Sequence, residues 1–419
     1  MSSVKNFFND YILPLRQNPS STSDNFPGNL TREQLKENGF LETRAGLDPR
    51  NDLDYPIQST FTQWRPNANY DDDSHLSAAD VVVLLPIWRL ASAFFNSPAS
   101  VRFVHAILYG PRDKNGYKNY RGNATEGAAT AKWSDLALGD ELHPSRISLF
   151  SIRREVALGM QCLDNYIWWG LVPPSSTESN PYYAAYTQRV GKVSLRGEEA
   201  LYREGSGSRI TLNRDVHQTL LDLHAQKDQT PDVLNSILRL QFRIATLMCH
   251  ELCHAVQNAV TTKMANGEDE PEPYWKSQSL NELGHAWENE VFGGVITTDE
   301  GDAVSGPIRV NKWPSEQAYD DSFRKIHARR SPKKVSSYYY VPMDWIANVQ
   351  KQRNWDLVII ENFRYDETLL YIPKQIGYRK ASGWRTSDPL WSQAQSSDGE
   401  CESDSEHRVL RVGLVSAKC

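Results

Sequence analysis

One segment, from Thr230 to Val260, constrains the fold of this 419-residue chain more than any other. It opens with Thr-Pro-Asp, and a hydroxyl residue followed by proline at the first helical position is typical of a helix start. Apolar residues then recur at helical spacing on a broad stripe, which predicts a long helix that is mostly buried. The stripe consists of Leu234, Ile237, Leu238, Phe242, Ala245, Met248, Leu252, Ala255 and Val256. Such a helix is a rigid platform for a binding site.

The second half of this helix carries the motif His-Glu-x-x-His, within the sequence MCHELCHAV. Residues four apart lie on the same helix face, so His250 and His254 can both point imidazole nitrogens at one metal ion. Glu251 then lies beside the metal, where its carboxylate can accept a proton from an activated water. The rival interpretation is a chance match, but without a metal these three residues would leave polar groups stranded in a core.

Two histidines do not complete a catalytic zinc site, which normally has three protein ligands and an open position. The natural place for the third ligand is the sequence NELGHAWE at residues 281–288, which is expected to form a second helix. It offers Glu282, Glu288 and His285, and ligand type alone leaves all three open. The acidic loop before it, from Glu268 to Glu272, is expected to be solvated.

The stretch between residues 243 and 294 resembles the gluzincins, zinc metallopeptidases whose ligands are the two histidines of HExxH and a downstream glutamate. The matching residues are His250, Glu251 and His254, followed by Leu280-Asn281-Glu282, which looks like the Asn-Glu pair that opens the ligand helix in several of those families. The resemblance implies a zincin-like α+β domain. It also implies Zn²⁺ held by His250, His254 and Glu282, with Glu251 as the general base.

The sequence departs from the gluzincin pattern at Ala286, where those families often place a second acidic residue four positions after the ligand. Glu288 is the alternative third ligand, because its Glu-Asn-x-x-x-Gly-Gly context also resembles the second motif of some zinc peptidases. The motifs thus place the third ligand on one short helix and leave the choice of residue open.

The implied function is hydrolysis of a peptide or protein substrate by a zinc-activated water, with Glu251 accepting the proton and delivering it to the leaving amine. A further donor should stabilise the oxyanion, and the candidates are Tyr338, Tyr339, Tyr340, His285 and His327. Two alternatives stay open, namely a non-catalytic binding protein stabilised by zinc and a zinc hydrolase of a non-peptide amide. A structural site is closed by a fourth protein ligand, whereas a catalytic site has an open position beside Glu251.

Two short segments before the long helix predict strands. VGKVSLR at 190–196 and SRITLNR at 208–214 contain β-branched residues and are separated by polar, glycine-bearing sequence. A strand placed just before the motif helix can offer an edge to which an extended peptide substrate pairs. A short helix is expected between them and the long one, from Asp215 to His224.

The expected organisation is one α+β catalytic domain, mostly helical with a small sheet, at residues 76–380 with its core at 190–300. Residues 1–75 are polar and expected to be partly disordered, with order beginning at His75, and residues 381–419 form an acidic and polar tail. Helices are expected over 81–95, with a break or kink at Pro86, over 101–110, and from Pro144 or Ser145 to Leu171.

A net charge of −6 is mild for 419 residues, and basic residues do not gather on one stretch, so no nucleic-acid partner is indicated. The N-terminal residues lack the pattern of a secretory signal, and the longest apolar run, Val81 to Trp88, is too short to span a bilayer. We therefore expect a cytoplasmic or otherwise intracellular protein without a membrane partner.

The five cysteines are few, odd in number and scattered, which suits a reducing compartment. Cys249 and Cys253 each precede a metal-facing histidine by one position, so their side chains are directed away from the metal. We expect both to be small core thiols and not a second metal or redox pair.

Overall fold

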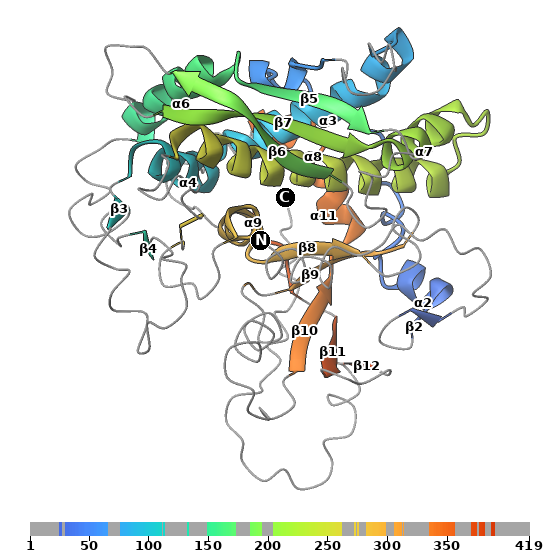
Figure 1. Cartoon of the computed structure of the whole chain (residues 1–419). Coiled ribbons are helices and arrows are strands. Elements are labelled where there is room, and N and C mark those ends of the chain that lie inside the picture. The colour runs from blue at the N-terminus through green and yellow to red at the C-terminus, as the bar shows by residue number, and fades with distance from the viewer. Residues whose placement is uncertain are drawn as a thin grey trace, which may run out of the picture.

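Helix α8 (Pro231–Val260) crosses the middle of the computed structural model, and the other elements are arranged around it (Figure 1). The structure describes residues 25–26, 30–65, 76–110, 112–113, 132–133, 149–172, 185–194, 204–261, 272–273, 275, 282–298, 306–311, 313, 335–356, 370–374, 377–381 and 387–389. Of the tail expected at 381–419, the structure describes only residue 381 and residues 387–389, which lie in paired strands, and the rest, with Cys401 and Cys419, lies outside the described residues.

Helix α8 forms as the sequence predicts. The Thr230 side chain accepts a hydrogen bond from the backbone N–H of Val233, and Pro231 occupies the first helical position. The helix packs against β6 and β7 on one side and against α3, α4 and α9 on others. Because neighbours cover it on several sides, its polar residues His250 and Glu251 are buried along with the apolar stripe.

A three-stranded sheet covers one side of α8, in the order β5 (Ile167–Val172), β7 (Glu204–Asn213) and β6 (Ala185–Ser194) (Figure 1). β6 runs antiparallel to β7 and β5 runs parallel to it. The two predicted strands are therefore confirmed over residues 190–194 of β6 and 208–213 of β7, whereas residues 195–196 lie outside the described residues and Arg214 begins α7. Within the described residues β6 pairs with β7 alone, so it forms one edge of this sheet.

Strand β5 corrects one expectation. The helix expected from Ser145 to Leu171 is wrong in its last part, because α6 spans Leu149–Leu163 and the chain then turns into β5. The strand begins Ile-Trp-Trp, residue types that favour strands, and Trp169 is fully buried beneath its neighbours. Pairing with β7 and burial of this indole thus override the apparent continuation of the helical pattern.

Helices α3 (Ala78–Phe95), α4 (Pro98–Tyr109) and α7 (Arg214–Ala225) lie where the sequence predicts helices. The break expected at Pro86 is absent, since α3 continues through it. Proline has no backbone N–H, so the carbonyl of Val82, four residues earlier, loses its helical hydrogen bond. Val82 is 66% exposed, so water can bind that carbonyl instead. Among the described helices α3 alone has the length and apolar composition of a membrane span, and 56% of that stretch is buried inside the protein.

The other side of α8 carries α9 (Leu283–Phe292) and a five-stranded antiparallel sheet. Its strands are, from edge to edge, β12 (Ser387–Pro389), β11 (Gly377–Ala381), β10 (Val335–Tyr340), β9 (Ile308–Asn311) and β8 (Val295–Thr298). Helix α11 (Met343–Asn348) and the one-turn helix α12 (Gln352–Asn354) follow β10. The fold is α+β as predicted, although its strands form more than one small sheet.

The expectation that order begins at His75 is wrong for residues 30–65. This segment contains β2 (Leu30–Thr31), α2 (Arg32–Glu37) and the 3-10 helix η1 (Ser59–Thr62), with β1 (Asn25–Phe26) paired to β2. Asn51 donates to the side-chain oxygens of Gln241 and Gln350 at 2.9 and 3.0 Å, which ties the segment to α8. The half-buried amide of Asn51 shows how a polar residue of this segment is paired with buried amides of the core. Two short paired strands, β3 (Arg112–Asp113) and β4 (Lys132–Trp133), complete the elements.

Candidate metal centre

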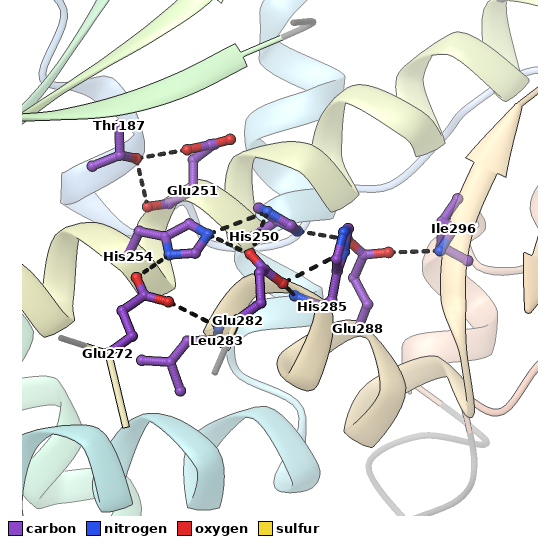
Figure 2. A network of polar contacts seen from close by, with 10 residues as sticks. All are labelled: Thr187, His250, Glu251, His254, Glu272, Glu282, Leu283, His285, Glu288 and Ile296. Carbon is purple, nitrogen blue, oxygen red and sulfur yellow. Dashed lines mark hydrogen bonds and ion pairs between the residues drawn. The ribbon is translucent and has the colours of Figure 1, made fainter. Parts of the chain in front are cut away.

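His250 and His254 lie on successive turns of α8 and point their rings to the same place (Figure 2). Their Nε2 atoms are 3.3 Å apart, and the two rings meet edge to face. Both imidazoles are largely removed from solvent, with side-chain exposures of 7% and 16%. The four-residue spacing on a regular helix therefore brings two nitrogen ligands together, as the sequence predicts.

Glu282 brings a carboxylate oxygen to this pair of nitrogens. It is the N-terminal cap of α9, and its Oε2 accepts a hydrogen bond from the backbone N–H of His285. This cap fixes the side chain so that Oε1 lies 2.8 Å from His254 Nε2 and 3.3 Å from His250 Nε2. Oε1 is buried and lacks a partner with hydrogen-bond geometry. The two histidines and Glu282 form one group of three convergent ligand atoms.

Glu288 contacts the opposite side of the His250 ring. Its Oε1 lies 2.7 Å from His250 Nδ1, and its Oε2 accepts a hydrogen bond from the backbone N–H of Ile296 at 2.6 Å. His285 Nδ1 lies 3.4 Å from the same Oε1, so His250, His285 and Glu288 make a second group of three candidate ligands. The two groups share His250 but use its two different nitrogens.

Glu272 is the functional candidate that sequence reasoning missed. It belongs to the acidic loop expected to be solvated, yet its Oε1 hydrogen-bonds His254 Nδ1 and its Oε2 accepts from the backbone N–H of Leu283 at 3.2 Å. The expectation is therefore wrong for this residue, whose side chain is only 21% exposed. Nearby Trp275 is buried against Phe103 of α4, with ring centroids 4.2 Å apart, which anchors this part of the chain. In the sequence Glu272 stands between two prolines, which restrict the backbone there, and this was the available signal that the loop has a defined conformation at that point.

A glycine makes room for the ring of His250. A Cβ atom at Gly284, the second residue of α9, would lie 2.4 Å from ring atoms of His250. This distance is far inside van der Waals contact, so any side chain there would displace the imidazole. Gly284 thus allows α9 to approach α8 closely enough for Glu282 and Glu288 to reach opposite nitrogens of one ring.

Glu251 lies beside the group and is not part of it. Its side chain is on the face of α8 that meets β6, where Oε2 is 2.7 Å from the hydroxyl oxygen of Thr187 (Figure 2). The residue is 5% exposed. Glu251 thus directly follows the candidate ligand His250 on α8, and its carboxylate contacts β6 and not the grouped ligand atoms.

The carboxylates and imidazoles of the cluster shift one another's pKa values toward the charged forms. Burial lowers the pKa of His250, but the carboxylates of Glu282 and Glu288 outweigh burial and raise this pKa to about 10. Burial likewise lowers the pKa of His254, and Glu272 and Glu282 outweigh it, raising the pKa well above its ordinary value. Burial raises the pKa of Glu282, and the surrounding histidines outweigh it, holding this pKa well below the usual range. The arrangement therefore favours ionised carboxylates at Glu282 and Glu288 and a positive charge between them, here on the histidine rings.

The candidate oxyanion donors separate into different environments. Tyr340 is buried against Phe40, and Tyr338 lies under the guanidinium of Arg309, so both pack within the second sheet. His285 stacks edge to face with His250 and contacts Trp313 at a ring-centroid distance of 4.7 Å. Tyr339 is half-buried against the main core, and His327 lies outside the described residues.

The cysteines of α8 are core thiols, as predicted. Cys249 and Cys253 are fully buried, and the Cys249 thiol donates to the backbone carbonyl of Ala91 on α3. Burial raises the pKa of both thiols well above the usual range, so they stay protonated. Neither belongs to a group of metal-ligand atoms among the described residues.

Comparison of the chain with protein-family models, with curated proteins and with solved structures gives no match. The chemistry of this cluster is therefore inferred from its own geometry.

Proposed function

We propose that this protein is a zinc-dependent metallopeptidase with a zincin-like catalytic domain, in which His250, His254 and Glu282 hold the metal. One observation carries the proposal: three ligand atoms converge at separations of 2.8 to 3.3 Å, with His250 and Glu282 buried and His254 largely so. Two ligand atoms at about 2.0–2.1 Å from a tetrahedral zinc ion lie roughly 3.3 Å apart. Oε1 of Glu282 is a buried oxygen that faces both Nε2 atoms, and a cation at this place would satisfy it.

The surroundings of both histidines favour a metal at Nε2. When Nε2 of a histidine binds zinc, its Nδ1 usually donates to a carboxylate or a backbone carbonyl, which fixes the tautomer and orients the ring. Here His250 Nδ1 meets Glu288 and His254 Nδ1 meets Glu272. Two imidazoles and one carboxylate are a donor set typical of catalytic zinc.

These contacts favour Glu282 over Glu288 and His285 as the third ligand. Glu288 already uses Oε1 for His250 Nδ1 and Oε2 for a backbone N–H, so both its oxygens have protein partners. A metal in the second group would have to displace the hydrogen bond of His250 Nδ1. Glu288 is better suited to orient the ring of His250 from behind.

Glu251 is the proposed general base. A bound zinc ion supplies Lewis-acid polarisation of the scissile carbonyl and acidifies an attacking water. Glu251 accepts the proton of that water and returns it to the leaving nitrogen when the peptide bond breaks. Its burial next to the ligands, without being one of them, fits this role. No fourth side chain of the described residues joins the three ligand atoms, which supports an open position.

The edge strand β6 supports a peptide as the substrate. It lies beside α8 and pairs with β7 alone among the described strands, so its other edge can pair with an extended chain. Thr187 of β6 also contacts Glu251, which places this edge next to the proposed base. Free thiols at Cys162, Cys249 and Cys253 support an intracellular setting.

The deciding experiment uses Glu251→Gln, a change that keeps the shape of the side chain and removes its basicity. We expect wild type and variant both to bind about one zinc ion per chain by elemental analysis. We expect the variant to lose cleavage of a quenched fluorescent peptide library by a factor of at least about 100. The matched control is Glu37→Gln, on the exposed face of α2.

Three results would count against the proposal. Equal peptide cleavage by Glu251→Gln and wild type would remove the general base. Zinc binding without cleavage of peptides by the wild type would favour a non-catalytic protein that zinc stabilises, and cleavage of small non-peptide amides alone would favour the other hydrolase.

A further inference from the structure

Strand β6 contacts the proposed base through one hydroxyl group. Thr187 Oγ1 lies 2.7 Å from Oε2 of Glu251 and 3.0 Å from the backbone carbonyl oxygen of the same residue. The carboxylate is buried, so this contact is shielded from the competition of bulk water. Figure 2 shows the hydroxyl facing one carboxylate oxygen and the backbone carbonyl oxygen of Glu251.

The position of the hydroxyl is fixed by two anchors between β6 and α8. Side chains two apart on a strand share a face, and Arg189, two residues after Thr187, places its Nε 2.6 Å from the side-chain oxygen of Asn258. Asn258 is seven residues after Glu251, which is about two helical turns. Thr187 and Arg189 therefore meet the same face of α8 at two successive points, and this double contact fixes the strand against the helix.

We propose that Thr187 is a positioning residue for the general base Glu251, and this inference rests on the proposed function. The Thr187 hydroxyl has a single hydrogen to donate, and an ionised carboxylate is the stronger of its two acceptors. Its hydrogen bond holds Oε2 of Glu251. No described residue donates a hydrogen bond to Oε1, so Oε1 is the oxygen left to exchange the proton with water and leaving group.

This arrangement links the base to the edge that would hold the substrate. Thr187 pairs with Ile210 of β7 on one side of its backbone, and the opposite side of β6 is the free edge within the described sheet. A peptide paired to that edge is therefore set in register by the same strand that sets the carboxylate. Loss of the hydroxyl should disturb the chemical step more than substrate binding, because the edge of β6 is unchanged.

The test compares Thr187→Val, which keeps the shape without the hydroxyl, with Thr187→Ser, which keeps the hydroxyl. Using the best-cleaved peptide of a quenched fluorescent library, we expect Thr187→Val to lower kcat by about 10- to 100-fold with KM within about threefold of wild type. Thr187→Ser should recover kcat to within about threefold of wild type. The control Thr219→Val removes a hydroxyl that bonds a backbone carbonyl on α7, and it should leave both constants unchanged.

An unchanged kcat in Thr187→Val, or a loss in Thr187→Ser as large as in Thr187→Val, would overturn the inference. A second readout is independent of turnover, namely the crystallographic position of the Glu251 carboxylate, which should shift or become disordered in Thr187→Val and stay in place in Thr187→Ser. Zinc affinity should be equal in both variants, since Thr187 touches no proposed ligand. If wild type cleaves no peptide, the proposed function fails, and an unmoved carboxylate in Thr187→Val separately refutes the positioning role.

Discussion

Replacement of Glu288 by Gln tests how the ring of His250 is held. Glu288 accepts one hydrogen bond from His250 Nδ1 at 2.7 Å and another from the backbone N–H of Ile296 at 2.6 Å. An amide keeps the size of the side chain but removes the charge, and its single oxygen serves only one of these donors. Loss of such an orienting carboxylate typically costs 10- to 100-fold in metal affinity, or about 1.4–2.7 kcal/mol.

Replacement of Glu282 by Gln should have a larger effect, because Glu282 is proposed to bind the metal itself. Its Oε1 is the only carboxylate oxygen among the described residues that lies within 3.3 Å of both Nε2 atoms. We expect Glu282→Gln to lower zinc affinity by more than about 100-fold, beyond the range for Glu288→Gln. The measurement is competition for zinc with a chromophoric chelator, and Glu37→Gln on α2 is the control.

The order of the two effects decides between the candidate ligands. If Glu288→Gln abolished zinc binding while Glu282→Gln reduced it only modestly, the metal would belong to the group of His250, His285 and Glu288. Equal affinities in wild type, Glu282→Gln and Glu288→Gln would refute the metal centre altogether. Thermal unfolding with and without added zinc is a second measurement of these relative affinities. A ligand at 100 times its Kd stabilises the folded state by about 2.7 kcal/mol, so a variant that binds zinc more weakly is stabilised less.

Two further predictions follow from packing and charge. Gly284→Ala places a Cβ 2.4 Å from the ring of His250, so we expect zinc affinity to fall by at least about tenfold, whereas the control Gly170→Ala, with its nearest contact at 3.5 Å, should bind normally. Burial lowers the pKa of His217, an effect that Asp80 opposes and Arg214 reinforces, so the unfolded state binds a proton more readily. The stability that this neutral ring contributes is therefore present above the unfolded pKa of about 6.5 and lost as pH falls below it. Urea unfolding should show a steeper acid-side loss for wild type than for His217→Gln, and parallel curves would contradict the assignment.

The parts of the site that sequence predicts are those that one helix determines. Periodicity and a capped start predict α8, and a regular helix then fixes His250, Glu251 and His254 relative to one another. The burial of Cys249 and Cys253 follows from the same geometry, because residues next to the histidines face another side of the helix, which packs in the core.

Long-range contacts explain what the sequence leaves open. Glu282 and Glu288 are both acidic residues of one short helix, and only the docking of α9 on α8 shows that they meet opposite nitrogens of the His250 ring. Glu272 lies in a loop whose composition suggests exposure, and its role depends on the anchor between Trp275 and α4. The segment 30–65 is similar, because the polar side chain of Asn51 suggests exposure in the sequence but is hydrogen-bonded to Gln241 of α8 and to Gln350 in the fold.

The docking of α9 gives the two histidines unequal support. His250 is held by α9 on both nitrogens and by the close approach at Gly284, so its ring is fixed wherever α9 is docked. His254 shares Glu282 with its neighbour but takes its orienting carboxylate from Glu272, outside α9. Glu272 in turn accepts from the backbone N–H of Leu283, the first residue of α9. The N-terminus of α9 therefore positions the proposed third ligand Glu282 and, through the backbone N–H of Leu283, also Glu272. Its cap fixes the Glu282 side chain, and its glycine at the second position lets the helix approach His250.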